Sequence, residues 1–397
     1  MKTIPMKYNF DEIILRENTN CVKYDLRKAY FGDENVLPLW VADMDFACAD
    51  FIQEAIIERA NHPIYGYSIL PDTLYSAISG WVQRRHKWDI DKSWISFSPG
   101  IVPALNIAIM AFSQPGDKVI VQPPVYFPFF SAVRNNKREL VYNQLKEQDG
   151  IYEMDFDDLE KKIDNKTKIL LLCHPQNPGG RVWKKDVLEK LVEICAKNNI
   201  IIISDEIHSD IMLNGRIHLP LASISKTASN ICVTCLAPSK TFNLAGMASS
   251  VVIIPDSQLK KTFDKKIEQI HIGAGNLFGN IAMQSAYERG DEWLDQLLKY
   301  LEINLELIRK FFIDRIPNVK LMVPEATYMV WLDFREFHLS DRDLKNFIIR
   351  SAGLGLSDGP VFGPGGKGFQ RLNFALPKAK LLIALEQLEK AVNTLGK

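Results

Sequence analysis

The sequence predicts an α/β fold in which a mostly parallel sheet is sandwiched by helices and a smaller α+β domain follows. Three observations support this prediction. Short, almost continuously apolar runs recur in the middle of the chain, helix-patterned segments separate them, and the pattern changes after about residue 290. Strands that are apolar on both faces are typical of parallel sheets covered on both sides. The later change of pattern indicates a second domain.

The predicted strands of the large domain are bounded by turn-forming residues such as Pro-Gly, Pro-Pro and His-Pro. A helix is predicted at residues 184–198, where apolar residues recur at helical spacing. In chain order, the strands are expected at residues 117–122, 168–173, 199–204, 231–236 and 249–254.

The second domain is predicted from long amphipathic helices around shorter strands. The helices are expected at residues 293–312 and 381–395, and the strands at 327–334 and 370–375. The beginning of the chain is rich in loops and is expected to pack against this domain. The predicted division is therefore an N-terminal segment (1–46), a large domain (47–290) and a small C-terminal domain (291–397).

Composition argues against several classes of partner. Lys plus Arg and Asp plus Glu are 48 each, so no net charge attracts the molecule to nucleic acid or to an anionic membrane. The apolar runs are strand-sized, far below the ~20 residues of a membrane-spanning helix. The N-terminus lacks the apolar region of a secretion signal. Six scattered cysteines fit a reducing compartment, so we expect a cytoplasmic protein.

Cys232 and Cys235 form a single C-x-x-C pattern inside an apolar stretch. A zinc site would need two more ligands at matching spacing, and the sequence offers none. We interpret the pattern as part of a buried strand and expect no bound metal.

Two ionisable residues follow apolar strands. Asp205 comes directly after the most apolar strand, where ligands of parallel α/β sheets bind, although such an Asp can also cap a helix. Lys240, in APSKTFNLAG, has no acidic neighbour in sequence. Desolvated lysines form Schiff bases with carbonyl compounds, whereas a single lysine is more often a surface charge. The combination of the two residues favours a reactive site.

Two turns add hydrogen-bond donors near the same sheet edge. Gly100, in SPGIVPAL, precedes a helix predicted at residues 103–112. Such a turn presents backbone N–H groups to a phosphate, although any helix can begin at a glycine. Asn177, in HPQNPGG, lies in a turn rigidified by proline and glycine directly after a strand.

Together these motifs resemble a known family. SPGIVPAL, PPVYFPF, HPQNPGG, SDEIHSD, APSKTFNLAG and QRLNFA occur in the order found in fold-type I enzymes that depend on pyridoxal 5′-phosphate (PLP), the aspartate aminotransferase superfamily of class I and II. The resemblance runs from about residue 30 to the C-terminus. PLWVADMDF (38–46) and His208 in DEIH are similar to the MalY/PatB-type cystathionine β-lyases, also described as cysteine-S-conjugate β-lyases.

The resemblance implies a role for each matching residue. Lys240, Asp205 and Tyr126 would be catalytic: Lys240 would carry PLP as a Schiff base, Asp205 would pair with the ring N–H, and Tyr126 would stack on the ring. Asn177 would bond the phenolic oxygen of the ring. The phosphate would be held by backbone N–H groups of Gly100, Ile101 and Val102, by the Ser239 hydroxyl, and by Tyr65 of a second subunit, which requires a homodimer with shared active sites. The amino-acid substrate would be bound by Arg371, Asn177 and Ala42, with Arg371 on the α-carboxylate.

One residue departs from the aminotransferase pattern. Many aminotransferases carry tyrosine three positions after the ring-nitrogen aspartate, where this chain has His208. Histidine can still donate a hydrogen bond there, and the resembled lyases share it, so the change favours a lyase. The alternative is a histidine whose hydrogen bonds are satisfied at the start of a helix.

The implied reaction is α,β-elimination. Lys240, freed by the incoming amino acid, would remove the Cα proton, and Asp205 would keep the cofactor ring protonated. A thiolate would leave the β-carbon, and cystathionine, cysteine or an S-substituted cysteine would yield thiol, pyruvate and ammonia. The substrate side chain is expected to lie near residues 40–43, the partner's Tyr65 region and the Gly- and Pro-rich loop 357–367, which we expect to order on substrate binding.

Two other functions stay open. An aminotransferase would use the same residues up to the removal of the Cα proton. A regulatory or binding protein could keep the fold without catalysis, but it would not need Lys240, Asp205 and Arg371 together, and the sequence contains no recognisable nucleic-acid-binding motif.

Overall fold

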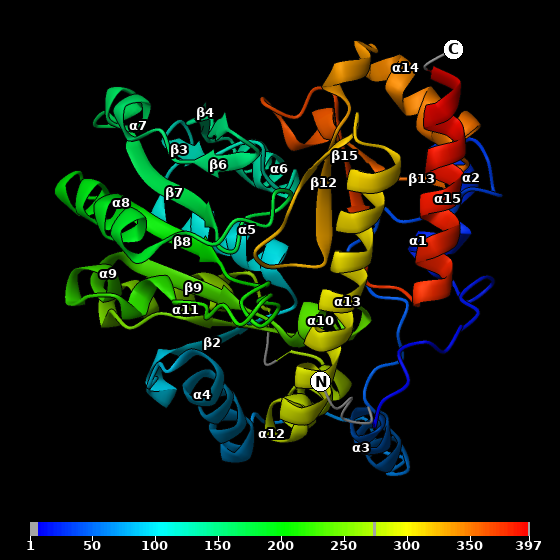
Figure 1. Ribbon diagram of the computed structural model, residues 1–397. Coiled ribbons are helices and arrows are strands. Elements are labelled where there is room, and N and C mark those ends of the chain that lie inside the picture. Colours follow the sequence, from blue (N-terminus) through cyan, green and yellow to red (C-terminus); the bar gives the residue numbers. More distant parts are fainter. Residues whose placement is uncertain (1–6, 273–274, 396–397) are drawn as a thin grey trace.

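The large domain of the computed structural model, which describes residues 7–272 and 275–395, is built on a seven-stranded sheet (Figure 1). Across the sheet the strands are β2 (Ile95–Ser98), β10 (Ser250–Ile253), β9 (Cys232–Leu236), β8 (Ile201–Asp205), β7 (Thr167–Cys173), β3 (Lys118–Val121) and β4 (Glu139–Tyr142). Within this sheet β10 is antiparallel to both of its neighbours, and the other pairs are parallel. The mostly parallel sheet predicted from the sequence is confirmed.

The sequence did not predict β2 and β4, for a physical reason. β2 is a short strand that alternates Ile and Phe with serines, and β4 is an edge strand whose side chains are partly exposed. Neither therefore has the continuous apolar run that marks the central strands.

Helices cover both faces of the sheet because alternate side chains of its strands are apolar on both sides. One face packs against α5 (Ile101–Phe112), α6 (Pro128–Asn135) and α11 (Ser257–Gln269). The other packs against α8 (Lys185–Lys197) and α9 (Lys226–Ile231). Cys232 and Cys235 both lie in β9 and are buried, which confirms the strand interpretation. Because the two cysteines are three residues apart in a strand, their side chains point to opposite faces of the sheet.

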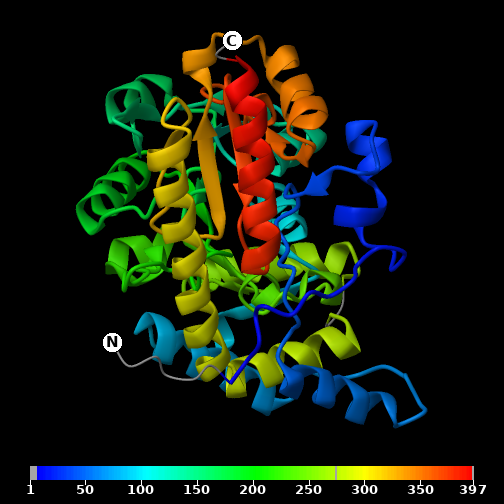
Figure 2. The ribbon, with the colours of Figure 1, turned by 45° about the vertical axis from the view of Figure 1, so that its right-hand side comes forward.

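The small domain contains a four-stranded antiparallel sheet. Across it the strands are β11 (Lys320–Met322), β12 (Met329–Asp333), β15 (Phe369–Asn373) and β14 (Ser357–Asp358). Its helices are α13 (Asp291–Arg315), α14 (Asp341–Asn346), a π-helical turn (Phe347–Ser351) and α15 (Lys378–Leu395). Figure 2 shows α13 and α15 side by side against this sheet.

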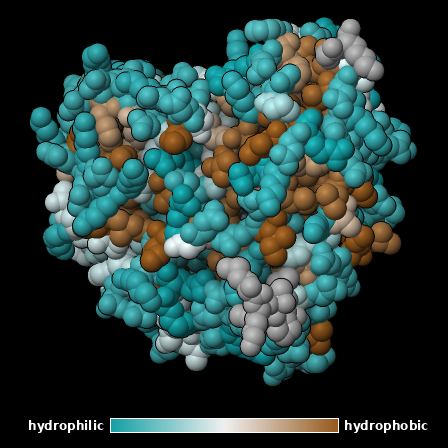
Figure 3. All heavy atoms as spheres, in the orientation of Figure 1, coloured by the Kyte–Doolittle hydropathy of each residue, from teal (hydrophilic) through white to brown (hydrophobic). Residues whose placement is uncertain are grey.

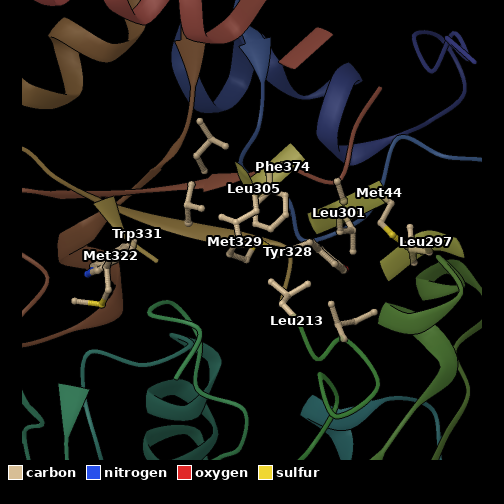
Figure 4. Packing of buried hydrophobic residues seen from close by; sticks show 14 of the residues in the cluster. Met44, Leu213, Leu297, Leu301, Leu305, Met322, Tyr328, Met329, Trp331 and Phe374 are labelled. Carbon is tan, nitrogen blue, oxygen red and sulfur yellow. The ribbon is translucent and has the colours of Figure 1, made fainter. Parts of the chain in front are cut away.

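An apolar cluster joins α13 to the small sheet. Figure 4 shows Leu301 and Leu305 of α13 beside Tyr328, Met329 and Phe374, all of which belong to the largest buried cluster of the molecule. The same cluster continues into the helical face of the large sheet that carries α8. The two domains therefore share one continuous core.

The N-terminal segment pairs with the small domain. It contains α1 (Val22–Asp25), α2 (Arg27–Phe31) and β1 (Leu37–Pro38), and β1 is parallel to β13 (Leu354–Gly355). Asn373 N–H donates to the Leu39 carbonyl at 2.9 Å, which continues the pairing. The boundaries expected near residues 46 and 290 stay predictions, and residues 1–6 and 396–397 of the expected segments lie outside the described residues.

The remaining elements lie around these two sheets. They are α3 (Asp50–Ala60), α4 (Asp72–His86), α12 (Leu277–Arg289), α7 (Phe156–Lys162), α10 (Pro238–Thr241), the hairpin β5 (Lys146–Gln148) with β6 (Ile151–Glu153), and 3₁₀ turns at Lys92–Trp94, Leu221–Ser223, Ala245–Met247, Arg335–Phe337 and Gly359–Phe362. Figure 3 shows a face that is mostly hydrophilic with scattered apolar side chains. In the described part of the chain, every helix is too short or too polar to cross a membrane.

The HPQNPGG turn is fixed against the small domain through Gly180. Its φ is +71°, and the Gly180 carbonyl accepts from the N–H groups of Glu325 at 2.9 Å and Ala326 at 3.1 Å. A Cβ at this position would lie 2.4 Å from Pro324 Cβ. Glycine therefore allows both the left-handed conformation and the close approach of the two chains.

We predict that Gly180→Ala destabilises the protein more than Gly116→Ala. Both positions have positive φ, which costs an alanine about 1–2 kcal/mol, but a Cβ at position 116 meets no atom within 4 Å. The clash at position 180 should add a further 1–3 kcal/mol or so. Urea unfolding of the two variants measures the difference in the free energy of unfolding. Equal losses of stability would contradict the close approach of the Gly180 turn to Pro324.

Candidate active site

Most of the residues predicted from the sequence gather at the carboxyl edge of the large sheet. Parallel strands end at the same edge, so the segments after β2, β3, β7, β8 and β9 converge there. They surround a cavity of about 270 Å³. The predicted residues that line it are Ala42, Gly100, Ile101, Val102, Tyr126, Asn177, Asp205, His208, Ser239 and Lys240. Pro99, Pro103, Cys173, Ile207, Ala245, Ala248 and Ser249, which the sequence did not single out, complete the lining.

Asp205, the last residue of β8, is a buried carboxylate at the floor of the cavity. One carboxylate oxygen accepts the backbone N–H of Ile207 at 3.1 Å, so the side chain caps a turn and not a helix. Burial raises the pKa of Asp205 to about 7, against the opposing effects of that N–H and of the charge on Lys240. A cationic N–H placed in the cavity would stabilise the ionised form.

Lys240 lies in the short helix α10, and its amine faces the cavity. The amine donates to the carbonyl oxygen of Ala42 at 2.5 Å. Burial lowers the pKa of Lys240 to about 8, and the charge of Arg371 lowers it too, against the opposing effects of Asp43 and Asp205. The neutral, nucleophilic and basic form of this amine is therefore more available near neutral pH than in an ordinary lysine.

The N-terminus of α5 forms one end of the cavity. The helix begins at Ile101, directly after Gly100, which is two residues earlier than the sequence predicted. The first N–H groups of a helix have no acceptor within it, and the helix dipole makes this end positive. Together with the Ser239 side chain, which also lines the cavity, this end suits a phosphate.

Arg371, in β15, is buried where the small domain meets the large one, and it contacts the cavity lining through Asn177. Its two terminal nitrogens donate to Asn177 Oδ1 at 3.0 Å and to the Trp40 carbonyl at 2.8 Å. No carboxylate of the described residues is ion-paired with it, and its Nε has no hydrogen-bond partner there. Burial lowers the pKa of Arg371 to about 10, so the group stays cationic at neutral pH and can bind an incoming carboxylate.

His208 lies in a turn rather than at the start of a helix. Its ring packs edge-on against Tyr328, with 6.0 Å between the ring centres. Among the described residues, Nδ1 has no hydrogen-bond partner, which does not fit the alternative of a fully satisfied histidine. Burial lowers the pKa of His208 to about 3, with Lys240 and Arg371 adding to the effect, so the ring is neutral at physiological pH.

The segment of residues 40–46, called the strap below, crosses from the small domain to the cavity. The side-chain amide of Asn373 donates to the carbonyls of Val41 at 2.7 Å and Asp43 at 2.6 Å. The carbonyl of Ala42 points to Lys240, and that of Trp40 points to Arg371. The strap therefore contributes backbone acceptors to the site.

Buried charges hold the other end of the strap. Arg16 pairs with Asp43 at 2.7 Å and with Asp45 at 2.5 Å, and the fully buried Lys23 pairs with Asp45 at 3.1 Å. Burial alone would raise the pKa of Asp45, but the two cations outweigh it and hold that pKa below its usual value. This charge cluster fixes the strap to the N-terminal segment.

Tyr65 does not lie in the cavity. Its hydroxyl donates to the Ala60 carbonyl at 2.7 Å, and 58% of the residue is exposed. It belongs to the segment between α3 and α4, in which Ile64, Tyr67 and Ile69 are also exposed.

Comparison with known proteins agrees with this geometry. The family model described as aminotransferase class I and II matches residues 34–388. The chain belongs to this family. It is 43% identical to cystathionine beta-lyase PatB of Bacillus subtilis, over 97% of this chain and 100% of that protein. Protein MalY of Escherichia coli is 30% identical over 94% of this chain and 96% of its own.

A solved structure supports the same family assignment. The PLP-bound C-S lyase from Staphylococcus hominis is similar with a TM-score of 0.91 and 33% identity, over 98% of both chains. The resemblance to the MalY/PatB group inferred from the motifs is confirmed, and so is the fold class.

Tyr328 is the main site residue that the sequence analysis missed. It is completely buried, and its hydroxyl donates to the Ala42 carbonyl at 3.1 Å, beside the amine of Lys240. In sequence it is one more aromatic residue of an apolar strand, and nothing local marks it as polar in function. Only the crossing of the strap brings it to the site.

We predict that Asp205 makes stability depend on pH in the cofactor-free protein. Because its pKa rises from 3.8 to about 7 on folding, the folded state keeps a proton that the unfolded chain releases. Below pH 3.8 Asp205 contributes its full share, up to about 4 kcal/mol, to the free energy of unfolding. This contribution is lost as the pH rises through 7. Urea unfolding between pH 4 and 8 should show this loss in the wild type and not in Asp205→Asn. Parallel curves for the two proteins would contradict it.

Proposed function

We propose that the protein is a PLP-dependent carbon–sulfur β-lyase. It acts by α,β-elimination on cystathionine, cysteine or an S-substituted cysteine and releases a thiol, pyruvate and ammonia. The observation that carries the proposal is the shared cavity of Lys240 and Asp205, a desolvated amine and a buried carboxylate at one sheet edge. The 43% identity to a cystathionine beta-lyase over the full length supports it.

The residues of the cavity fit PLP. Asp205, whose buried carboxylate is not ion-paired with a cation of the described residues, would accept the ring N–H. The α5 N-terminus at Gly100, Ile101 and Val102, with Ser239, would bind the phosphate. When bound, PLP supplies an electron sink for the electrons of the Cα–H bond.

Three further residues would contact the cofactor ring. Tyr126 would stack on one face, because it lines the cavity and offers a large aromatic surface. The amide of Asn177 and the ring of neutral His208 would bond the phenolic oxygen, because both residues line the cavity. Ala42 and Asn177 also lie beside the expected position of the substrate.

Lys240 and Arg371 would act on the amino acid itself. Arg371 would bind the α-carboxylate through its guanidinium, which Asn177 already orients. Lys240 would remove the Cα proton, because its pKa of about 8 makes the neutral amine more available at physiological pH than in an ordinary lysine. The C–S bond then breaks, and the electron pair leaves with the sulfur.

Amino-group transfer is the alternative reaction in this family. It requires the same residues as far as the removal of the Cα proton, so the cavity alone does not exclude it. The relatives named lyases and the histidine at position 208 favour elimination. A second product, the free thiol, distinguishes the two reactions.

We also propose a cytoplasmic homodimer with shared active sites. The exposed apolar side chains of Ile64, Tyr65, Tyr67 and Ile69 support a subunit interface, in which Tyr65 would reach the phosphate of the partner. Six unpaired cysteines support a reducing compartment.

We predict that the purified enzyme converts cystathionine to pyruvate and free thiol over many turnovers without an added keto acid. Lys240→Ala should lower turnover by at least about 10²- to 10⁴-fold, because the general base is lost. It should also abolish the visible absorbance that depends on the lysine linkage. Lys261→Ala, at an exposed position of α11, is the matched control. A stall after one turnover would favour amino-group transfer.

We predict that two inactive variants restore each other when their subunits are exchanged. If Tyr65 serves the partner's site, a mixed dimer of Lys240→Ala and Tyr65→Ala subunits contains one site with both native residues. Mixing after mild denaturation and refolding should then regain activity that neither parent has. No recovery, with mixed dimers demonstrated by mass spectrometry, would contradict the shared site.

A further inference from the structure

The carbonyl oxygen of Ala42 accepts two hydrogen bonds, one from each domain. The amine of Lys240 in α10 donates at 2.5 Å, and the hydroxyl of Tyr328, next to β12, donates at 3.1 Å. Tyr328 is completely buried, and burial raises its pKa far above the usual value, so its hydroxyl keeps its proton. Tyr328 therefore always acts as a donor to this carbonyl.

The position of this carbonyl is fixed along the strap. Asn373 holds the carbonyls on both sides of it, those of Val41 and Asp43. Beyond them, Asn243 pairs with the backbone of Met44, accepting at 2.9 Å and donating at 3.0 Å. The strap is thus tethered on both sides of Ala42, whereas the partners of the Ala42 carbonyl itself, among the described residues, are Lys240 and Tyr328.

The strap also sets the direction in which Lys240 is held. The Trp40 carbonyl bonds Arg371 and the Ala42 carbonyl bonds Lys240, so the two acceptors lie along one side of the site. Arg371 is the group that would bind the α-carboxylate, and that carboxylate is attached directly to Cα. A lysine amine held toward the strap is therefore held on the Cα side of a bound amino acid.

We propose that Tyr328 is a positioning residue that, through the Ala42 carbonyl, keeps the amine of Lys240 on the Cα side and so favours elimination over amino-group transfer. The proposal rests on the lyase function proposed above. A buried tyrosine and a backbone carbonyl would then help to determine which of the two reactions occurs.

The chemistry explains why position matters. In both reactions Lys240 takes the Cα proton and becomes an ammonium. In elimination the C–S bond then breaks, sulfur leaves with the electron pair, and the ammonium proton can neutralise the thiolate. In amino-group transfer the same proton must reach the cofactor carbon that is joined to the amino group, which lies farther from Arg371 than Cα does. Holding the ammonium at Ala42 slows that second transfer.

The test is Tyr328→Phe in the holoenzyme, with Tyr152→Phe as the matched control. Phenylalanine keeps the ring that packs against His208 and removes only the hydroxyl. Tyr152 is equally buried and its hydroxyl accepts from Trp331 Nε1 at 3.0 Å, but it makes no contact with the strap or with Lys240 through that group. Each variant therefore loses one hydrogen bond between the small domain and another part of the chain.

The first measurement is the ratio of elimination events to amino-transfer events with one sulfur amino acid. Amino transfer is counted as loss of visible absorbance that an added keto acid restores. Tyr328→Phe should lower the ratio about three- to tenfold, the size expected for one hydrogen bond, while Tyr152→Phe leaves it unchanged. An unchanged ratio in a folded Tyr328→Phe protein overturns the proposal.

The second measurement does not depend on turnover. The charged and titratable groups that face the Lys240 amine are Asp43, Asp205, Arg371 and His208, and Tyr328→Phe alters none of them. Loosening the Ala42 carbonyl weakens the hydrogen bond that stabilises the ammonium, so the amine should titrate at lower pH. Reductive methylation of Lys240 in cofactor-free protein is followed by peptide mass spectrometry across pH 6–10. The pH at which Lys240 becomes methylated should be lower in Tyr328→Phe than in the wild type and unchanged in Tyr152→Phe.

The two measurements separate the possible failures. If the wild type shows no elimination, the proposed lyase function fails, and the methylation profile still tests whether Tyr328 holds Lys240. If Tyr328→Phe does not fold, Asn373→Ser, which loosens the strap from the small-domain side, replaces it and should lower the ratio in the same direction. A methylation profile identical to that of the wild type in either folded variant overturns the positioning role.

Discussion

A carboxylate buried at the carboxyl edge of a parallel sheet is the constraint on which the rest of this structure depends. Asp205 is nearly inaccessible, and burial raises its pKa against the weaker opposing effects of the Ile207 N–H and of Lys240. Such a group is tolerated where a ligand supplies the missing positive charge. The helices on both faces of the sheet and the core shared by the two domains exclude water from this edge, which makes the interaction with that ligand strong.

A second group of polar residues, centred on Asp210, lies behind the cavity and fixes the residues that line the cavity. Asp210 accepts from Trp81 Nε1 at 3.1 Å and from Thr241 Oγ1 at 2.7 Å, and His86 lies 3.0 Å away. Because Thr241 follows Lys240 in α10, this carboxylate ties the lysine-bearing turn to α4. Among the neighbouring groups, burial raises the pKa of Glu206 and lowers that of His218, whose Nε2 lies 2.7 Å from the Glu206 carboxyl.

On the small-domain side, the strap likewise holds residues of the site in position. Its acidic residues are neutralised by Arg16 and Lys23, whereas its carbonyls are left to bond Lys240 and Arg371. The two groups that would act on the amino acid are thus positioned by one segment that belongs to neither sheet.

The sequence by itself determined the fold class and most of the cavity. Continuous apolar strands, the turns after them and the positions of Asp205, Lys240 and Asn177 follow from local patterns, because the ends of parallel strands must meet at one edge. The loop 357–367 is partly buried, and the Phe362 carbonyl accepts from Val125 N–H at 2.9 Å, but its ordering on substrate binding stays a prediction. The tertiary structure alone decided the partners of the Ala42 carbonyl and the buried pairing of Lys23 with Asp45. These contacts join residues far apart in sequence, and a backbone carbonyl or a tyrosine in an apolar strand carries no local signal of what will cross it.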